Sequence, residues 1–251
     1  MHTSSYWINH FKENLTKQRI HWQMPEVSSA EKQAILYSLK AWQKGETSDG
    51  CHLKAATLKY SRRIKDPDYY HAIELFIKEE QKHGENLGKY IDLLGEKRLR
   101  FDLGDYLFRM VRYFATSMEI WTITVIIVES AAQVFYQALK DATECRLLKD
   151  ICTDILIDEA YHITFQQERL AQIFANKGFV RFHLAIVMYY ILYRFTRKAI
   201  WLGHAKAFKA GGVTKEKFYN LMELKLQKIF HAVADNHNLF QKKLIHLNIN
   251  Q

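Results

Sequence analysis

Apolar residues recur every three or four positions along most of this 251-residue chain, which is the spacing of helices that bury one face. The pattern predicts four long helices followed by two more, with Asp66-Pro67, Gly95, Gly178 and Gly211-Gly212 as breaks. We place these helices at about residues 28–65, 69–94, 105–140, 145–176, 180–210 and 214–247. Residues 1–27 carry no long stripe and are predicted to form an N-terminal arm with room for one short helix.

Acidic and histidine residues interrupt these buried stripes at related positions. Glu80 and His83 lie on the stripe of the second helix, and Glu159 and His162 lie on that of the fourth. With 16 Glu and 12 His in the chain, chance alone gives roughly one Glu-x-x-His pair, so the spacing itself has little weight. Their burial matters more, because an unpaired carboxylate or imidazole on an apolar face costs several kcal/mol by order of magnitude.

The upstream helices each offer one more inward carboxylate, Glu129 on the third helix and Glu46 on the first. Glu129 and Glu159 both lie roughly 17 Å from their shared turn at 1.5 Å per residue, so they should meet. Glu46 lies roughly 25 Å from its turn against roughly 18 Å for Glu80, and Asp49 fits somewhat better. The first-helix ligand is therefore left open between Glu46 and Asp49, close to the two interrupting glycines Gly45 and Gly50.

Four inward carboxylates and two imidazoles at one level of a four-helix bundle are a ligand set that suits two Fe or Mn ions. Without a metal they would be a group of buried, mutually repelling anions. The predicted ligands are Glu46, Glu80, His83, Glu129, Glu159 and His162. A metal-bound histidine needs an acceptor for its other ring nitrogen, and we expect Glu79 to support His162 and Asp158 to support His83.

These residues resemble the ligand pattern of the ferritin-like di-iron carboxylate superfamily over about residues 28–177. The string Glu79-Glu80-Gln81-Lys82-His83-Gly84 is similar to the corresponding helix of the soluble acyl-carrier-protein desaturases, as is Asp158-Glu159-x-x-His162 to their fourth helix. The whole chain also resembles a set of uncharacterised bacterial ferritin-like proteins. Leu87 stands where radical-forming ribonucleotide reductase subunits have a tyrosine, and Ile155 where arylamine N-oxygenases have a third histidine.

The resemblance implies an all-α protein: a ferritin-like four-helix bundle over residues 28–177, with residues 178–251 forming two additional helices packed on it. It also implies a non-haem di-iron, or Fe/Mn, oxidase or oxygenase that uses dioxygen and an electron donor on a small or carrier-bound substrate. A peroxide-consuming or ferroxidase-type protective protein is the first alternative. A metal-free helical interaction protein is the second.

Composition and charge refine this picture. Two prolines and ten glycines favour helices throughout, and the absence of an apolar leader or a bilayer-length uncharged run favours a cytoplasmic, non-transmembrane protein. The three cysteines are interpreted as buried thiols.

Positive charge is concentrated in the last third of the chain. Residues 180–251 hold 12 Lys and Arg against 3 Asp and Glu, so an acidic partner is expected there if these helices bind one, with nucleic acid disfavoured. A homodimer stays open.

Aromatic and small residues near the predicted ligands allow two interpretations. The aromatic residues Trp42, Trp121, Phe114, Phe135 and Tyr136 either pack the core or line an apolar substrate cavity. Gly45 and Gly50 either leave room for a substrate or allow two helices to approach closely.

Overall fold

The computed structural model describes the backbone of residues 1–113, 117–175 and 177–249, and the side chains of these residues except 107–108, 111–113 and 236–249. Within these ranges all regular elements are helices. They are α1 (Ser4–Leu15), α2 (Ser29–Glu46), α3 (Cys51–Ile64), α4 (Pro67–Leu93), α5 (Leu103–Tyr113), α6 (Met118–Asp141), α7 (Arg146–Ala175), α8 (Phe179–Ala210) and α9 (Lys215–Ile249).

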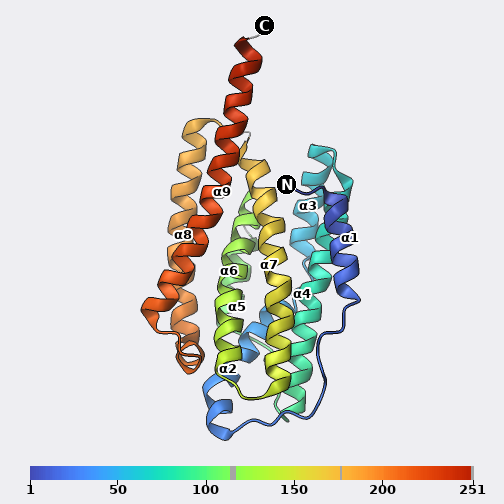
Figure 1. Cartoon of the computed structure of the whole chain (residues 1–251), viewed down its shortest axis with the longest axis vertical. Coiled ribbons are helices and arrows are strands. Elements are labelled where there is room, and N and C mark those ends of the chain that lie inside the picture. Colours follow the sequence, from blue (N-terminus) through green and yellow to red (C-terminus); the bar gives the residue numbers. More distant parts are fainter. Residues whose placement is uncertain (114–116, 176, 250–251) are drawn as a thin grey trace.

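The helices α2, α4, α6 and α7 form the central bundle (Figure 1). The α6–α7 hairpin makes the most extensive contact, and α4 packs against both α2 and α7. On one side α1 packs on α4, while α3 packs on α4 and α6. On the opposite side α8 covers α6 and α2, and α9 covers α7 and α6. The two C-terminal helices therefore pack on the bundle as predicted.

Two of the predicted long helices are each divided in the structure. The first breaks between Glu46 and Cys51, where Gly50 adopts a left-handed φ of 63° and Asp49 accepts a hydrogen bond from the Cys51 amide. A Cβ on Gly50 would lie 2.5 Å from Ile77 Cδ1, so packing as well as backbone geometry requires glycine there. The predicted third helix is α5 and α6, because Ser117 is extended and its hydroxyl caps α6 through the Ile120 amide.

Helix α6 is the centre of the bundle. Among the described residues it is also the one helix that is long and apolar enough to cross a membrane, judged by length and composition alone. Its most apolar window has a mean hydropathy of 1.4 and is 78% buried inside the protein. Burial against neighbouring helices accounts for this composition, as a central helix requires.

The N-terminal arm is part of the core. On α1, Trp7 and Phe11 are almost completely buried and pack against Phe165 of α7, and Phe11 also lies close to Phe76 of α4. Among the cysteines Cys145 and Cys152 are buried as expected, whereas Cys51 is exposed at the start of α3, so the prediction was wrong for that residue.

Candidate metal centre

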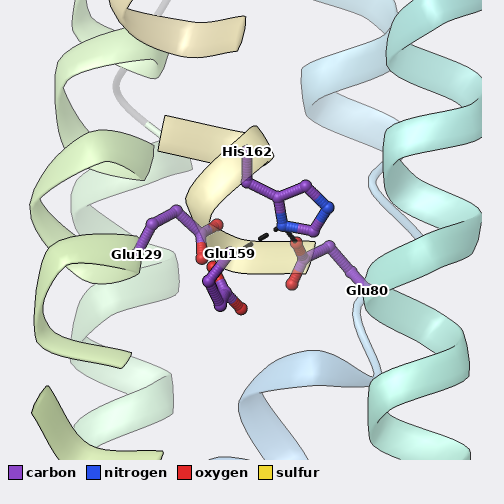
Figure 2. Close-up of side chains that lie close together, drawn as sticks. All are labelled: Glu80, Glu129, Glu159 and His162. Atoms are coloured by element: carbon purple, nitrogen blue, oxygen red, sulfur yellow. Dashed lines mark ion pairs between the residues drawn. The ribbon is translucent and has the colours of Figure 1, made fainter. Parts of the chain in front are cut away.

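The structure brings all six predicted ligands to one level of the bundle. Glu80 and His83 come from α4, Glu129 from α6, Glu159 and His162 from α7, and Glu46 is the last residue of α2. One atom each of Glu80, Glu129, Glu159 and His162 lies within 4.8 Å of the others, and the same holds for Glu46, Glu80 and His83. Figure 2 shows the first of these groups with its side chains converging.

Glu159 lies between the two imidazoles. Its Oε1 is 3.8 Å from His83 Nδ1, and its Oε2 is 3.6 Å from His162 Nδ1. Neither oxygen has a hydrogen-bond partner, although the side chain is fully buried. Nδ1 of His83 is likewise without a hydrogen bond, whereas Nδ1 of His162 lies 2.7 Å from Glu80 Oε1 in an ion pair (Figure 2). Buried polar atoms are normally satisfied, and a bound cation would satisfy this set.

The outer nitrogens of the histidines are held in a crossed arrangement. Glu79, on α4, lies 2.7 Å from Nε2 of His162 on α7, and Asp158, on α7, lies 3.0 Å from Nε2 of His83 on α4. Both carboxylates are completely buried. This is the pairing expected from the sequence, and it orients each Nδ1 towards the centre.

The amide of Asn14, which sequence reasoning missed, joins these two carboxylates. Its Nδ2 donates to Glu79 at 2.6 Å and to Asp158 at 2.7 Å, and its oxygen accepts from Arg19. Asn14 follows Trp7 and Phe11 at helical spacing on the buried stripe of α1, with 1% of its surface exposed. The signal that could have identified Asn14 is a polar residue that continues an apolar stripe at helical spacing.

Arg19 and Lys82 bring positive charge to the outer side of the centre. Arg19 donates to Asp154 at 2.6 Å and to Asp158 at 2.8 Å, and Lys82 lies 3.3 Å from Asp154. Although burial opposes it, the hydrogen bonds from His83, Asn14 and Arg19 hold the pKa of Asp158 below its ordinary value. The outer carboxylate therefore remains charged and able to orient His83.

Glu46, and not Asp49, points into the centre. The Tyr136 hydroxyl on α6 donates to Glu46 Oε1 at 2.7 Å, whereas Asp49 is exposed and bonded to the Cys51 amide. A Cβ on Gly84 would lie 3.1 Å from Glu46 Cβ, so the lack of a side chain there lets α2 come close to α4. Tyr136 is a second residue whose contact with the centre sequence reasoning missed, since it was assigned either to the core or to a cavity wall.

The inward carboxylates repel one another and lie in a low-dielectric interior. Burial, and next the Glu129 carboxylate, raise the pKa of Glu80, while burial and Glu159 raise that of Glu129. Burial raises the pKa of Glu159 to about 7. Although burial lowers it, the nearby Glu80 carboxylate raises the net pKa of His162, and the hydrogen bond to Asp158 raises that of His83. The donor set, carboxylates and imidazoles, fits Fe or Mn.

Metal-free protein is expected to lose stability as pH rises from about 5 to about 8. The raised carboxyl pKa values favour folding below about pH 4.5, and this contribution is lost as pH rises through the folded pKa, about 7 for Glu159. The raised histidine pKa values act in the same direction, since their contribution is present below about pH 6.5 and is lost above the folded values. Thermal melts in chelator across this range measure the effect.

The variant Glu159→Gln removes one of these titrations. Without metal it should be more stable than the parent chain at about pH 7.5, by on the order of 3 kcal/mol, and its melting curve should depend less on pH. A parent melting temperature that stays flat or rises through this window would contradict the charge assignment.

A cavity of about 1190 Å³ opens onto the same centre. Glu46, Glu80 and Glu129 are among the residues that line it. Apolar side chains from α4, α6 and α8 line much of the rest, among them Phe76, Trp121, Val125, Val128, Leu192 and Ile200. Charged residues, among them Lys44, Asp102, Asp105 and Arg109, also line it. Gly45 faces this space, and a Cβ placed on it would meet no atom within 4 Å, so Gly45 provides room and Gly50 provides close packing.

The aromatic residues divide between the two expected roles. Trp42 and Trp121 line the cavity, whereas Phe135 is fully buried in the core. Tyr136 is also buried and contacts Glu46. The side chain of Phe114 lies outside the described residues.

Comparison with known proteins shows similarity in structure. No protein-family model matches the sequence, and no curated protein matches it either. A protein with aldehyde deformylating oxidase activity from Synechococcus has a TM-score of 0.63 at 16% identity, covering 87% of this chain and 98% of that one. A variant R2-like ligand-binding oxidase with a Mn/Fe cofactor has a TM-score of 0.58 at 17% identity, over 96% of this chain and 93% of the other.

Another variant of the R2-like ligand-binding oxidase, with an Fe/Fe cofactor, gives a TM-score of 0.59 at 17% identity over the same shares of the two chains. At such low identities the likeness concerns the fold. The chain therefore has the ferritin-like helical-bundle fold that its sequence predicted.

Proposed function

We propose that this protein is a di-metal oxidase or oxygenase that uses dioxygen to oxidise an apolar organic substrate. The observation that carries the proposal is the cavity, because three of the six predicted ligand residues line a largely apolar space of about 1190 Å³. The structurally similar proteins support it, since they are oxidases and two of them carry Mn/Fe or Fe/Fe cofactors.

The residues that would hold the metals are Glu46, Glu80, His83, Glu129, Glu159 and His162. Bound there, two iron ions, or manganese and iron, would supply the electrons that dioxygen needs. Glu159 faces both histidines, and Glu80 belongs to both groups of converging atoms, so both carboxylates are shared between the two sets of side chains that would hold the metals.

The other residues hold this constellation in place. Glu79 and Asp158 fix the orientation of the two imidazoles, and the Tyr136 hydroxyl fixes one oxygen of Glu46. The apolar side chains of Val125, Val128 and Trp121 would bind an apolar substrate in the same cavity that Glu46, Glu80 and Glu129 line. Leu87, one turn beyond His83, is fully buried and carries no group that could store a radical.

A peroxide-consuming or ferroxidase-type protein would use the same ligands but needs no apolar cavity. A metal-free interaction protein would leave both oxygens of Glu159 and Nδ1 of His83 buried without a hydrogen bond. The cavity and the unsatisfied atoms therefore favour the oxidase over both alternatives. We also propose that the protein receives electrons from a separate donor and that it is cytoplasmic.

Filling the cavity is expected to separate substrate oxidation from metal binding. In Val128→Trp the indole would occupy the space beside Glu129, so the variant should load the same amount of iron but lose substrate-dependent oxygen consumption by about tenfold or more. Single-turnover reactions of the iron-loaded protein with a panel of apolar aldehydes, alkanes and arylamines, analysed by mass spectrometry, measure this. The variant Leu224→Trp, on the exposed face of α9, is the matched control.

Equal oxygen consumption by the parent and Val128→Trp, with no product from any member of the panel, would favour the protective alternative. Loss of iron from Val128→Trp would show that the substitution disturbs the centre itself, and the smaller Val128→Phe would then be compared in the same assay.

A further inference from the structure

The outward face of α8 is apolar over its first half. Large apolar side chains recur there every three or four residues, and each has half or more of its surface exposed. They are Phe179, Val180, Leu184, Val187, Met188, Ile191 and Phe195, which we call the α8 stripe. Soluble monomers rarely expose contiguous apolar patches of this kind without a binding role.

The inward face of the same helix is also apolar, because Phe182, Tyr189 and Tyr193 are buried against the bundle. The packing of α8 on α6 and α2 is therefore complete without the stripe. The stripe is the second apolar face of one helix, and the described residues of the chain leave it exposed to solvent.

Only positive charges lie beside the stripe on its own helix. Helix α8 contains six Lys and Arg residues and no Asp or Glu. Arg181, Arg194 and Lys198 are exposed next to the apolar positions, while Arg197 is turned inward and paired with Glu223. An apolar face flanked by exposed basic side chains is the pattern of a helix that lies in the interface of an anionic bilayer.

We propose that the α8 stripe docks this protein on an anionic lipid surface, with its apolar side chains in the acyl boundary and Arg181, Arg194 and Lys198 at the headgroups. A second copy of the chain fits this face less well. In a two-fold interface built on this stripe the basic side chains of both copies would flank the same contact, and α8 supplies no carboxylate to balance them.

The stripe ends at the cavity that Glu46, Glu80 and Glu129 line. Phe195, at the end of the stripe, lines that cavity, as do Leu192 and the exposed Leu202 farther along α8. An apolar molecule dissolved in the bilayer could therefore reach the cavity without crossing water. This last step rests on the proposed function, whereas the docking of α8 does not.

Vesicle flotation of the full chain tests the docking. The protein should float with vesicles of phosphatidylcholine containing roughly 30% phosphatidylglycerol at about 50 mM salt, and much less with phosphatidylcholine alone or at about 0.5 M salt. Ile191→Glu and Leu184→Glu should each lower the partition coefficient about tenfold or more. Arg194→Gln and Lys198→Gln should each lower it about fivefold.

Leu224→Glu is the matched control, because Leu224 is equally exposed but lies on α9. It should leave flotation unchanged, and all variants should retain the parent's metal content and melting temperature. The proposal is overturned if the parent does not float with anionic vesicles at low salt. It is also overturned if the parent is a dimer that Ile191→Glu dissociates while flotation is unaffected, which would assign the stripe to a second copy.

Metal content is measured on the same preparations. A chain that floats but binds no metal would refute the proposed function and leave the docking intact. A chain that binds two metals but does not float would refute the docking and leave the proposed function intact.

Discussion

Replacing Glu159 by alanine is expected to abolish loading of both metals. The two oxygens of Glu159 face His83 Nδ1 and His162 Nδ1 at 3.8 and 3.6 Å, so a single truncation removes a ligand atom from each position. The side chain is fully buried, so its truncation leaves a gap inside the close-packed bundle. Metal content after anaerobic Fe(II) loading and desalting, determined by elemental analysis, should fall from about two ions per chain to near zero.

Glu46→Ala is expected to give a different result, because Glu46 converges only with Glu80 and His83. It should retain about one ion, held by Glu80, Glu129, Glu159 and His162. Asp49→Ala should retain about two, since Asp49 is exposed and serves the turn before α3. Glu74→Ala, on the outer face of α4, is the control for the loss of a carboxylate from a ligand helix.

Full metal content in Glu159→Ala would refute the bundle centre. Loss of an ion from Asp49→Ala, with Glu46→Ala unaffected, would show that Asp49 is the first-helix ligand, as axial spacing favoured.

The inward positions of the centre could be predicted because they depend on helical periodicity alone. Glu80, His83, Glu159 and His162 lie on stripes whose neighbours are unmistakably apolar, and the crossed support by Glu79 and Asp158 follows from the offset of adjacent residues on a helix. Such positions survive small errors in helix boundaries. Their role as metal ligands could be predicted because a buried carboxylate is costly unless a partner or a metal compensates its charge.

The choice between Glu46 and Asp49 could not be made in that way. Axial arithmetic assumed one continuous helix, whereas α2 ends at Glu46 and the left-handed Gly50 immediately precedes a separate helix, α3. The close approach of α2 to α4 at Gly84 then sets the level of Glu46. Both features depend on tertiary contacts, which cannot be predicted from the presence of glycines in the local sequence.

The α8 stripe was hidden for a related reason. Because α8 is apolar on both its inward and its outward face, its periodicity is weak, and the sequence indicated an ordinary amphipathic helix. The excess of positive charge in residues 180–251 was visible, but its significance depends on which side chains are exposed beside it. Only the packing of α8 on α6 shows that Ile191 and Phe195 lie outside.

Asn14→Asp is expected to weaken metal binding by about 100-fold and to destabilise the metal-free protein. The change is nearly isosteric, but it replaces the amide that donates to Glu79 and Asp158 with a third carboxylate at 2.6 and 2.7 Å from them. Arg19, which already donates to the side-chain oxygen of Asn14, offsets only part of this repulsion, because the same guanidinium also serves Asp154 and Asp158. Chelator competition for Mn(II), followed by electron paramagnetic resonance, measures affinity independently of activity.

The exposed Asn9 on the same helix gives the matched control, and Asn9→Asp should alter neither affinity nor melting temperature. Asn14→Leu should weaken binding less than Asn14→Asp, since it removes the two hydrogen bonds without adding a charge. A chain in which Asn14→Asp binds Mn(II) as tightly as the parent would show that α1 only covers the bundle. The predicted order, with aspartate worse than leucine, instead makes α1 part of the electrostatic support of both histidines, because a purely steric role would tolerate the isosteric aspartate better.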